Sequence, residues 1–346
     1  MTGYALLLQP SANRVYAAAA SGLARAELEL FGRAAVVGGI GAIAEATIGG
    51  VGYLTFTAPD LDARAVALLS NLSAGYALFE RAGDLLRPVG LQRLDRYDDD
   101  LITIQKYQGK TNEQFTKLLL NVTLLASSSG PEMLTRKLAV LDPLCGRGTT
   151  LNQALMYGYD AAGLDLDQKD FAAYRAFIQN WLQRKRLKHH VSYDGPVRRN
   201  GKVVARRLQV SLAPGRDAWQ AGATQVLDVV SADTTSTAEF FRPGSADVIV
   251  TDAPYGVQHG SRSAAAGLAR GPLELLRQAV PGWAGVLRPG GAIGIAWNTL
   301  VARREDAAAI LAAAGLEPLT QPPYLSFRHR VDQAIVRDVL VARKPG

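Results

Sequence analysis

Residues 137–167 read KLAVLDPLCGRGTTLNQALMYGYDAAGLDLD, and this stretch decides the fold. An apolar run ends at Asp142, a glycine-rich turn follows, and a helical pattern leads into a second apolar run that ends at Asp165. Strands that alternate with helices in this way indicate parallel β-α-β units. We therefore expect a Rossmann-like α/β sheet built around this stretch.

The glycine-rich turn, residues 142–149, reads DPLCGRGT and differs from the two common phosphate-binding turns. It lacks the G-x-G-x-x-G spacing of dinucleotide-binding proteins and the Gly-Lys-Ser/Thr ending of the Walker type. Gly146 and Gly148 would still let the backbone approach a ligand and would leave amides available at the start of the helix. By itself, this turn predicts only that a ligand binds here.

Acidic residues end the expected strands, and their positions indicate the kind of ligand. Asp165 follows Gly146 by 19 residues and is well placed to accept hydrogen bonds from the two hydroxyls of a ribose. Asp233 could meet an adenine amino group, or it could be an ordinary helix N-cap. Open α/β sheets bind ligands at the carboxyl ends of their strands, where we expect Asp142, Asp165, Asp233 and Asp252. An adenosine-containing ligand is therefore implied.

The chain divides into two regions by its patterning. Residues 1–100 predict a small α+β domain with two strands and two amphipathic helices, the second helix over residues 63–80. A charged stretch without apolar periodicity, RLDRYDDD at 93–100, is the expected linker. Residues 101–346 predict the α/β domain, whose last segment resembles an antiparallel hairpin added at a sheet edge.

Residues 247–256 read DVIVTDAPYG, in which an apolar strand pattern stops abruptly. The sequence places the carboxylate of Asp252, a turn that Pro254 makes rigid, and the ring of Tyr255 side by side. An ordinary strand-to-loop turn with an exposed tyrosine would give the same pattern. The motifs upstream of this stretch favour a functional interpretation instead.

In this order and spacing, DPLCGRGT, GLDLD and DAPYG resemble the motifs of class I S-adenosylmethionine-dependent methyltransferases, specifically those that methylate exocyclic amino groups of nucleobases. The resemblance covers about residues 105–345. The glycine turn, DAPYG and the lead-in KYQGKTNEQFTKLLLNVTLLAS look like those of the tRNA guanosine N2-methyltransferases. The family motif is usually Asp/Asn-Pro-Pro-Tyr/Phe, whereas this chain has Ala253 in the second place.

The resemblance implies S-adenosylmethionine as the cofactor and a role for each residue of the DAPY motif. The Asp252 carboxylate and the Ala253 carbonyl would accept the hydrogens of the acceptor amine, Pro254 would fix the turn, and Tyr255 would stack on the base. A larger set is expected to bind the cofactor: Asn112, Phe115, Asp142, Cys145, Gly146, Gly148, Thr149, Asp165, Asp233 and Thr234.

A basic insertion at residues 182–212 interrupts the alternating pattern. Its segment 184–207 carries nine Lys or Arg and a single Asp, which accounts for the chain's net charge of +7. Asn200-Gly201 between two β-rich runs predicts a hairpin, so we expect a basic helix end and a basic ribbon projecting from the sheet. A solvated face would also explain the charge, but a polyanion such as RNA is favoured. The expected nucleic-acid contacts are Arg184, Lys185, Arg186, Arg198, Arg199, Lys202, Arg206 and Arg207.

Other features narrow the remaining classes. One cysteine fits a reducing compartment, and the absence of a signal-peptide pattern or membrane span favours a cytoplasmic location. Cys145 has no histidine near it in sequence and is expected to be a small packing residue rather than a nucleophile. The four histidines lack metal-ligand spacing, so no metal is expected.

The sequence thus predicts an enzyme that methylates an exocyclic base nitrogen in RNA, with guanine N2 in tRNA as the favoured acceptor. Two alternatives stay open. The acceptor could be adenine in DNA or a nitrogen of a small molecule or peptide, or the chain could be a cofactor-binding, RNA-associated protein without turnover.

Overall fold

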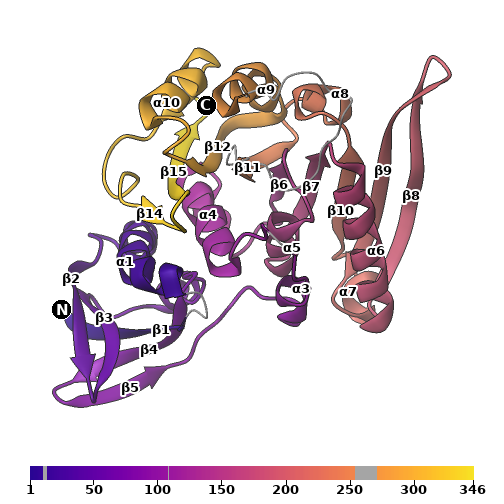
Figure 1. Cartoon of the computed structure of the whole chain (residues 1–346). Helices are drawn as coiled ribbons and strands as arrows, with labels where there is room; N and C mark the ends of the chain where they lie inside the picture. Colours follow the sequence, from indigo (N-terminus) through magenta and orange to yellow (C-terminus); the bar gives the residue numbers. More distant parts are fainter. Residues whose placement is uncertain (11–13, 108, 254–270) are drawn as a thin grey trace.

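The computed structural model describes residues 1–10, 14–107, 109–253 and 271–346 (Figure 1). Within these residues, strands β1 to β5 form a five-stranded antiparallel sheet, and β6 to β15 form a ten-stranded mixed sheet. No helix in this part of the chain is both long and apolar enough to cross a membrane. The two sheets lie side by side in the view of Figure 1, with the smaller one at the lower left.

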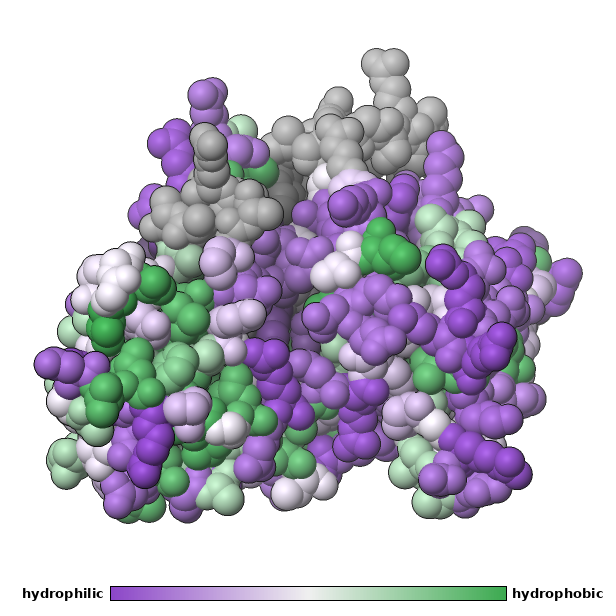
Figure 2. Space-filling view, turned by 90° about the horizontal axis from the view of Figure 1, so that it is seen from below, coloured by the Kyte–Doolittle hydropathy of each residue, from purple (hydrophilic) through white to green (hydrophobic). Residues whose placement is uncertain are grey.

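The N-terminal sheet has the order β2-β3-β1-β4-β5. Its strands are β1 (Thr2–Leu8), β2 (Gly41–Ile48), β3 (Val51–Ala58), β4 (Gly75–Ala82) and β5 (Leu85–Val89). Helices α1 (Arg14–Ala35) and α2 (Ala63–Leu69) bury apolar residues such as Leu28 and Leu68 against Leu54 and Phe56 of the sheet. Apolar residues also gather on the outside of this unit, at the left of Figure 2.

The helix predicted over residues 63–80 is wrong in its second half, because α2 ends at Leu69 and β4 begins at Gly75. Leu78, which fitted the helical spacing, instead pairs with Leu6 of β1 and is 2% exposed. Burial across the sheet therefore overrides the local apolar pattern. Strand β2 was not predicted either; its residues are mostly half-buried or exposed.

The large sheet has the order β13-β15-β12-β11-β6-β7-β10-β9-β8. Strands β6, β7, β10, β11 and β12 pair in parallel, and β15 runs antiparallel between β12 and β13. The bounds of these strands are β6 (Ala139–Asp142), β7 (Asp160–Asp165), β10 (Gln225–Ser231), β11 (Ala246–Asp252), β12 (Leu287–Asn298), β13 (Glu317–Pro318) and β15 (Val336–Arg343). This order confirms the Rossmann-like fold class.

The predicted C-terminal hairpin exists, since β14 (His329–Arg330) pairs antiparallel with β15. Its predicted place is confirmed as well: β15 pairs with β12 on one side and with the short strands β13 and β14 on the other, so the hairpin forms one edge of the large sheet. Strand β15 therefore begins beside the carboxyl end of β12, and only β12 separates it from β11. This position becomes important for the site.

Helices cover both faces of the large sheet (Figure 1). One face carries α4 (Glu113–Ala126), α5 (Thr149–Met156) and α6 (Gln168–Arg184), and the other carries α9 (Pro272–Val286) and α10 (Arg304–Ala313). Gly294 of β12 allows α4 to approach, since a Cβ there would lie 1.8 Å from Thr123 Oγ1. Short elements complete the fold: α3 (Asp100–Thr103), η1 (Gly130–Glu132), α7 (Arg216–Gln220), η2 (Thr234–Ser236) and α8 (Thr237–Phe240).

The basic insertion forms the hairpin that its sequence predicts, with β8 (Lys188–Arg199) and β9 (Lys202–Ala213) joined by Asn200-Gly201. Both turn residues have positive φ, 48° and 76°, as a two-residue type I′ turn requires. The tip of this ribbon projects beyond β10, as expected, and only its base belongs to the sheet (Figure 1). Strand β9 pairs with β10 from Leu212 to Arg206, so the hairpin extends the sheet at its edge.

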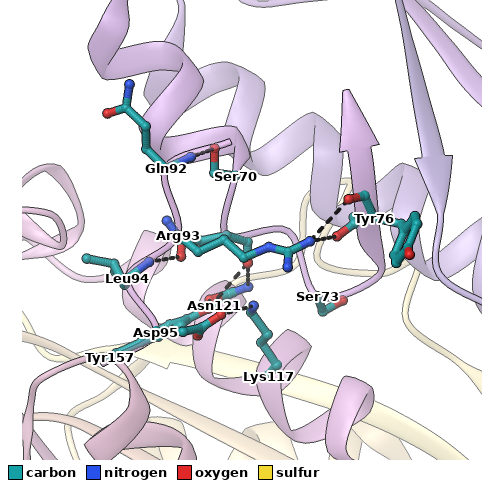
Figure 3. Close-up of polar contacts among 12 residues, drawn as sticks. Ser70, Ser73, Tyr76, Gln92, Arg93, Leu94, Asp95, Lys117, Asn121 and Tyr157 are labelled. Atoms are coloured by element: carbon teal, nitrogen blue, oxygen red, sulfur yellow. Dashed lines mark hydrogen bonds and ion pairs between the residues drawn. The ribbon is translucent and has the colours of Figure 1, made fainter. Parts of the chain in front are cut away.

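The two sheets are joined through a buried polar network between α1 and α4. The Glu27 carboxylate accepts hydrogen bonds from the Asn121 amide at 2.7 Å and from the Ser73 hydroxyl at 2.5 Å, and Tyr157 donates to Asn121 at 2.8 Å. Complete burial raises the pKa of Glu27. Figure 3 shows Asn121, Tyr157 and Lys117 beside the chain that leads from one sheet to the other. These contacts fix the start of the large sheet against the first.

Candidate active site

The glycine-rich turn connects β6 to α5 and is tied to the end of β7. The Cys145 amide donates to the Leu164 carbonyl at 2.8 Å, and the Gly146 amide donates to Asp165 Oδ2 at the same distance. Gly146 and Gly148 have φ of 48° and 80°, in the left-handed region that favours glycine. A Cβ at Gly148 would lie 2.3 Å from the ring of Tyr174. Both positions therefore favour glycine because of their left-handed backbone, and Gly148 also because a side chain there would overlap the Tyr174 ring.

Two buried carboxylates lie at the carboxyl ends of β6 and β7. Burial raises the pKa of Asp142 to about 7 and that of Asp165 to about 6. Asp165 Oδ1 accepts a hydrogen bond from the Asp167 amide at 2.8 Å, and Asp142 Oδ1 accepts one from the Leu144 amide at 3.1 Å. Desolvated acids of this kind suit a ligand with hydroxyl donors or positive charge, and S-adenosylmethionine carries both. The donor set thus fits the cofactor.

Asp233 and Thr234 follow the end of β10. Asp233 Oδ1 accepts hydrogen bonds from the Thr235 amide at 2.9 Å and the Thr235 hydroxyl at 2.8 Å, so the residue does serve as an N-cap, here of η2. The Thr234 hydroxyl accepts a hydrogen bond from the Trp283 indole at 3.0 Å. Both residues lie at the correct edge of the sheet, and their cofactor role stays a prediction.

Cys145 is 5% exposed, and burial raises the pKa of its thiol well above the usual value. A Cβ added at Gly163 would lie 2.8 Å from its sulfur, which shows how closely the turn packs on β7. The thiol is therefore a poor nucleophile and a packing group.

Thr149, at the start of α5, lies 3.1 Å from the hydroxyl of Tyr107, measured between the two oxygens.

Asp252 ends β11 and is contacted by two side chains from distant parts of the chain. The Thr111 hydroxyl donates to Asp252 Oδ2 at 2.7 Å, and the Arg337 guanidinium lies 3.4 Å from the same oxygen. Ala253 is 2% exposed, and its amide donates to the Ala296 carbonyl at 2.8 Å. Pro254 and Tyr255, the other two predicted catalytic residues, lie outside the described residues.

The lead-in helix α4 begins beside Asp252. Asn112 is its N-cap and accepts a hydrogen bond from the Phe115 amide at 3.1 Å. The Phe115 ring is completely buried; the Arg337 guanidinium lies 4.4 Å from its centroid and the His329 ring 5.2 Å. Asn112 and Phe115 therefore lie beside the residues that contact Asp252. Their predicted contact with the cofactor stays a prediction.

A pocket of about 240 Å³ opens between the start of α4 and the β14–β15 hairpin. It shares Thr111 and Arg337 with the surroundings of Asp252, and all but one of its lining residues are polar or charged. The lining residues are Lys110, Thr111, Asn112, Glu113, His329, Arg330, Val331 and Arg337. The pocket lies on the β12–β15 side of Asp252, whereas the glycine turn and Asp165 lie on the β6–β7 side.

Sequence reasoning missed Thr111, Tyr107 and Arg337. Arg337 and its neighbour Asp338 are 5% exposed charged residues within an otherwise apolar strand. Adjacent charges in an apolar run are expensive to bury without partners, so they could have marked the position as special. Nothing local distinguishes Thr111 from any other threonine in a turn.

The predicted nucleic-acid contacts divide into two groups. Lys185, Arg199 and Arg207 form ion pairs with acidic side chains of the same chain, the last of these bidentately with Asp228. For the other five cations, the described residues supply no ion pair: Arg184, Arg186, Arg198, Lys202 and Arg206. All five are exposed.

Part of the chain, including the candidate site, matches a known protein family model. Residues 132–290 match a family model described as RMKL-like, methyltransferase domain. That segment contains the glycine turn, Asp165 and Asp252. The match covers less than half of the chain, and together with the order of the large sheet it is consistent with a class I methyltransferase fold, whose cofactor is S-adenosylmethionine.

Several solved structures are similar to the chain at low identity. TrmN from Thermus thermophilus is 17% identical, with a TM-score of 0.38 over 86% of this chain and 57% of that one. A TehB-like methyltransferase from Corynebacterium glutamicum is 15% identical, with a TM-score of 0.33 over 62% and 84% of the two chains. A Burkholderia thailandensis 1,6-didemethyltoxoflavin-N1-methyltransferase is 13% identical, with a TM-score of 0.35 over 70% and 94%. The sequence matches none of the curated proteins compared with it.

Proposed function

We propose that this protein methylates an exocyclic amino nitrogen of a nucleobase in RNA, with guanine N2 in tRNA as the acceptor. The observation that carries the proposal is the place of Asp252. Strand β11 pairs in parallel with β6, with Ile249 opposite Leu141, so Asp142 and Asp252 end neighbouring strands. A carboxylate thus lies next to the cofactor turn, at the end of the sheet where ligands bind.

The chemistry of an aromatic amine explains why a carboxylate is needed there. The lone pair of the amino nitrogen is delocalised into the ring, so the nitrogen is a weak nucleophile. Bound S-adenosylmethionine supplies an electrophilic methyl group on a sulfonium. Asp252 and the carbonyl of Ala253 accept the amine hydrogens, which orients the nitrogen and keeps electron density on it. Pro254 and Tyr255 keep their predicted roles of fixing the turn and stacking on the base.

The choice of RNA rests on the basic residues of the insertion. Strand β9 is four strand positions from β11, which at about 4.8 Å per strand is roughly 20 Å along the sheet. A base at Asp252 and phosphates at the hairpin must therefore belong to an extended acceptor. Phosphate contacts at that distance position a polynucleotide and carry no sequence choice.

Transfer of a tritiated methyl group from labelled S-adenosylmethionine tests the proposal directly. The purified protein is incubated with unfractionated tRNA, with genomic DNA and with extract protein, and the labelled polymer is digested to identify the modified unit. We expect label in tRNA as N2-methylguanosine. Label in DNA adenine or in protein would show that the acceptor is not tRNA. Cofactor binding without methyl transfer to any polymer or small amine would favour a protein without turnover.

A further inference from the structure

The two contacts of Asp252 described above come from segments that are distant from it in sequence. Thr111 precedes α4 by two residues and lies 141 positions upstream of Asp252; Arg337 lies on β15, 85 positions downstream. Both reach the same carboxylate oxygen, Oδ2. A carboxylate contacted from two directions has a defined plane, which a single contact from its own strand would not give.

Arg337 is itself fixed in position. Its side chain is 6% exposed, and its guanidinium lies over the buried ring of Phe115 at 4.4 Å. Strand β15 pairs with β12 in a register that places Arg337 opposite Asn298, at the carboxyl end of the sheet. The guanidinium therefore cannot turn away without leaving both the ring and the carboxylate.

The turn that carries Thr111 is fixed as well. The Lys110 ammonium donates to the Ile102 carbonyl at 2.7 Å and pairs with Glu113 at 2.5 Å. Asn112 caps the helix by accepting a hydrogen bond from the Phe115 amide at 3.1 Å. The hydroxyl of Thr111 is thus presented to Asp252 from a turn with contacts on both sides.

We propose that Thr111 and Arg337 are positioning residues that orient the Asp252 carboxylate toward the acceptor amine. The inference rests on the proposed function, since it assigns these residues a role through Asp252. A preorganised acceptor gains most in the transition state, when the amine hydrogens become more acidic. Loss of one contact should therefore lower kcat and leave cofactor affinity unchanged.

The test compares Thr111→Val with Thr111→Ser. Valine keeps the shape of threonine and removes the hydroxyl, whereas serine restores it. We expect Thr111→Val to lower kcat for methyl transfer to tRNA by about 10-fold, the effect of losing one hydrogen bond to a charged group. Thr111→Ser should return kcat to within about twofold of wild type. The dissociation constant for S-adenosylmethionine, measured by calorimetry, should stay within about twofold in both.

Thr116→Val is the matched control, because it removes a threonine hydroxyl in the same helix start that does not reach Asp252. We expect it to leave kcat within about twofold of wild type, since its hydroxyl contacts only the backbone. Arg337→Gln removes the second contact to the carboxylate. We expect it, too, to lower kcat and to leave the affinity for S-adenosylmethionine unchanged. If Thr111→Val does not fold, Arg337→Gln decides the question alone.

A double-mutant cycle separates action through Asp252 from a general structural effect. In an Asp252→Ala background, Thr111→Val should cause no further loss of kcat, because the residue through which it acts is gone. An equal loss in both backgrounds would overturn the inference, as would a Thr111→Val variant that behaves like Thr116→Val. In either case wild-type transfer to tRNA would leave the proposed function standing. A wild type that binds the cofactor and labels no acceptor would instead overturn the proposed function.

Discussion

The backbone amide of Gly146 donates a hydrogen bond to Asp165 Oδ2 at 2.8 Å. This contact joins the turn after β6 to the end of β7, so the two halves of the cofactor site are one unit. Burial raises the pKa of this carboxyl to about 6. Asp165 therefore shapes the turn, and in its predicted role it would also accept hydrogen bonds from the ribose.

Asp165→Ala should weaken binding of S-adenosylmethionine by at least about 10-fold, because it removes both the ribose acceptor and the partner of Gly146. Calorimetric titration of the purified variant measures the change. Asp167→Asn is the control: it lies two residues away and caps α6 by accepting a hydrogen bond from the Lys169 amide, which asparagine can also do. Equal affinities for the two variants would contradict the assigned role of Asp165.

The raised pKa of Asp142 predicts how stability depends on pH. Folded Asp142 has a pKa of about 7, against 3.8 for the unperturbed group, so between these values the folded state binds more protons than the unfolded state. Stability from this group therefore falls as pH rises. Asp142→Asn removes the titration, and its stability relative to wild type should increase by roughly 1–3 kcal/mol between pH 5 and pH 8.

Urea denaturation of the cofactor-free protein at both pH values measures this difference. The midpoint of Asp142→Asn should move little with pH compared with that of wild type, apart from changes common to both. A constant gap between the two proteins across the range would show that Asp142 is not protonated preferentially in the folded state.

Local signals predicted the parts of the site that are close in sequence. The strand, turn, helix and strand from Lys137 to Asp167 follow from the apolar pattern and the two glycines, whose φ values are indeed positive. The Asn200-Gly201 turn follows in the same way, because only a few residue pairs fit a type I′ turn. In both segments the chemistry of the backbone itself decides the conformation.

Contacts that depend on tertiary packing could not be predicted from the sequence. Whether residues 75–80 continue a helix or enter a sheet depends on the pairing of Leu78 with Leu6, which lies 72 residues away. The surroundings of Asp252 depend on β15 entering the sheet between β12 and β13, which brings Arg337 to it. Neither pairing leaves a pattern in the neighbouring sequence.

Gly148→Ala should abolish cofactor binding and lower the melting temperature. The left-handed backbone alone costs about 1–2 kcal/mol with a Cβ present, and here the Cβ would also overlap the Tyr174 ring at 2.3 Å. Gly222→Ala separates the two effects, since Gly222 has a similar φ of 72° but open space around it. The two variants are compared by thermal denaturation and calorimetry. If both lose the same stability and both bind the cofactor, the turn tolerates a side chain and the close packing on Tyr174 is unimportant.

Arg206→Glu should weaken binding to tRNA and make it less dependent on salt. Arg206 is exposed on the hairpin and forms no close ion pair within the described residues, so it is available to a phosphate. Its neighbour Arg207 pairs with Asp228 in β10, and changing that residue would disturb the fold instead. Removing one phosphate contact should reduce the slope of log affinity against log salt by about one, and charge reversal should exceed that. Arg277→Glu makes the same change of charge on an exposed residue of α9, outside the hairpin. Binding measured by fluorescence anisotropy from 50 to about 300 mM salt should separate the two variants, and identical slopes would mean that the hairpin faces only solvent.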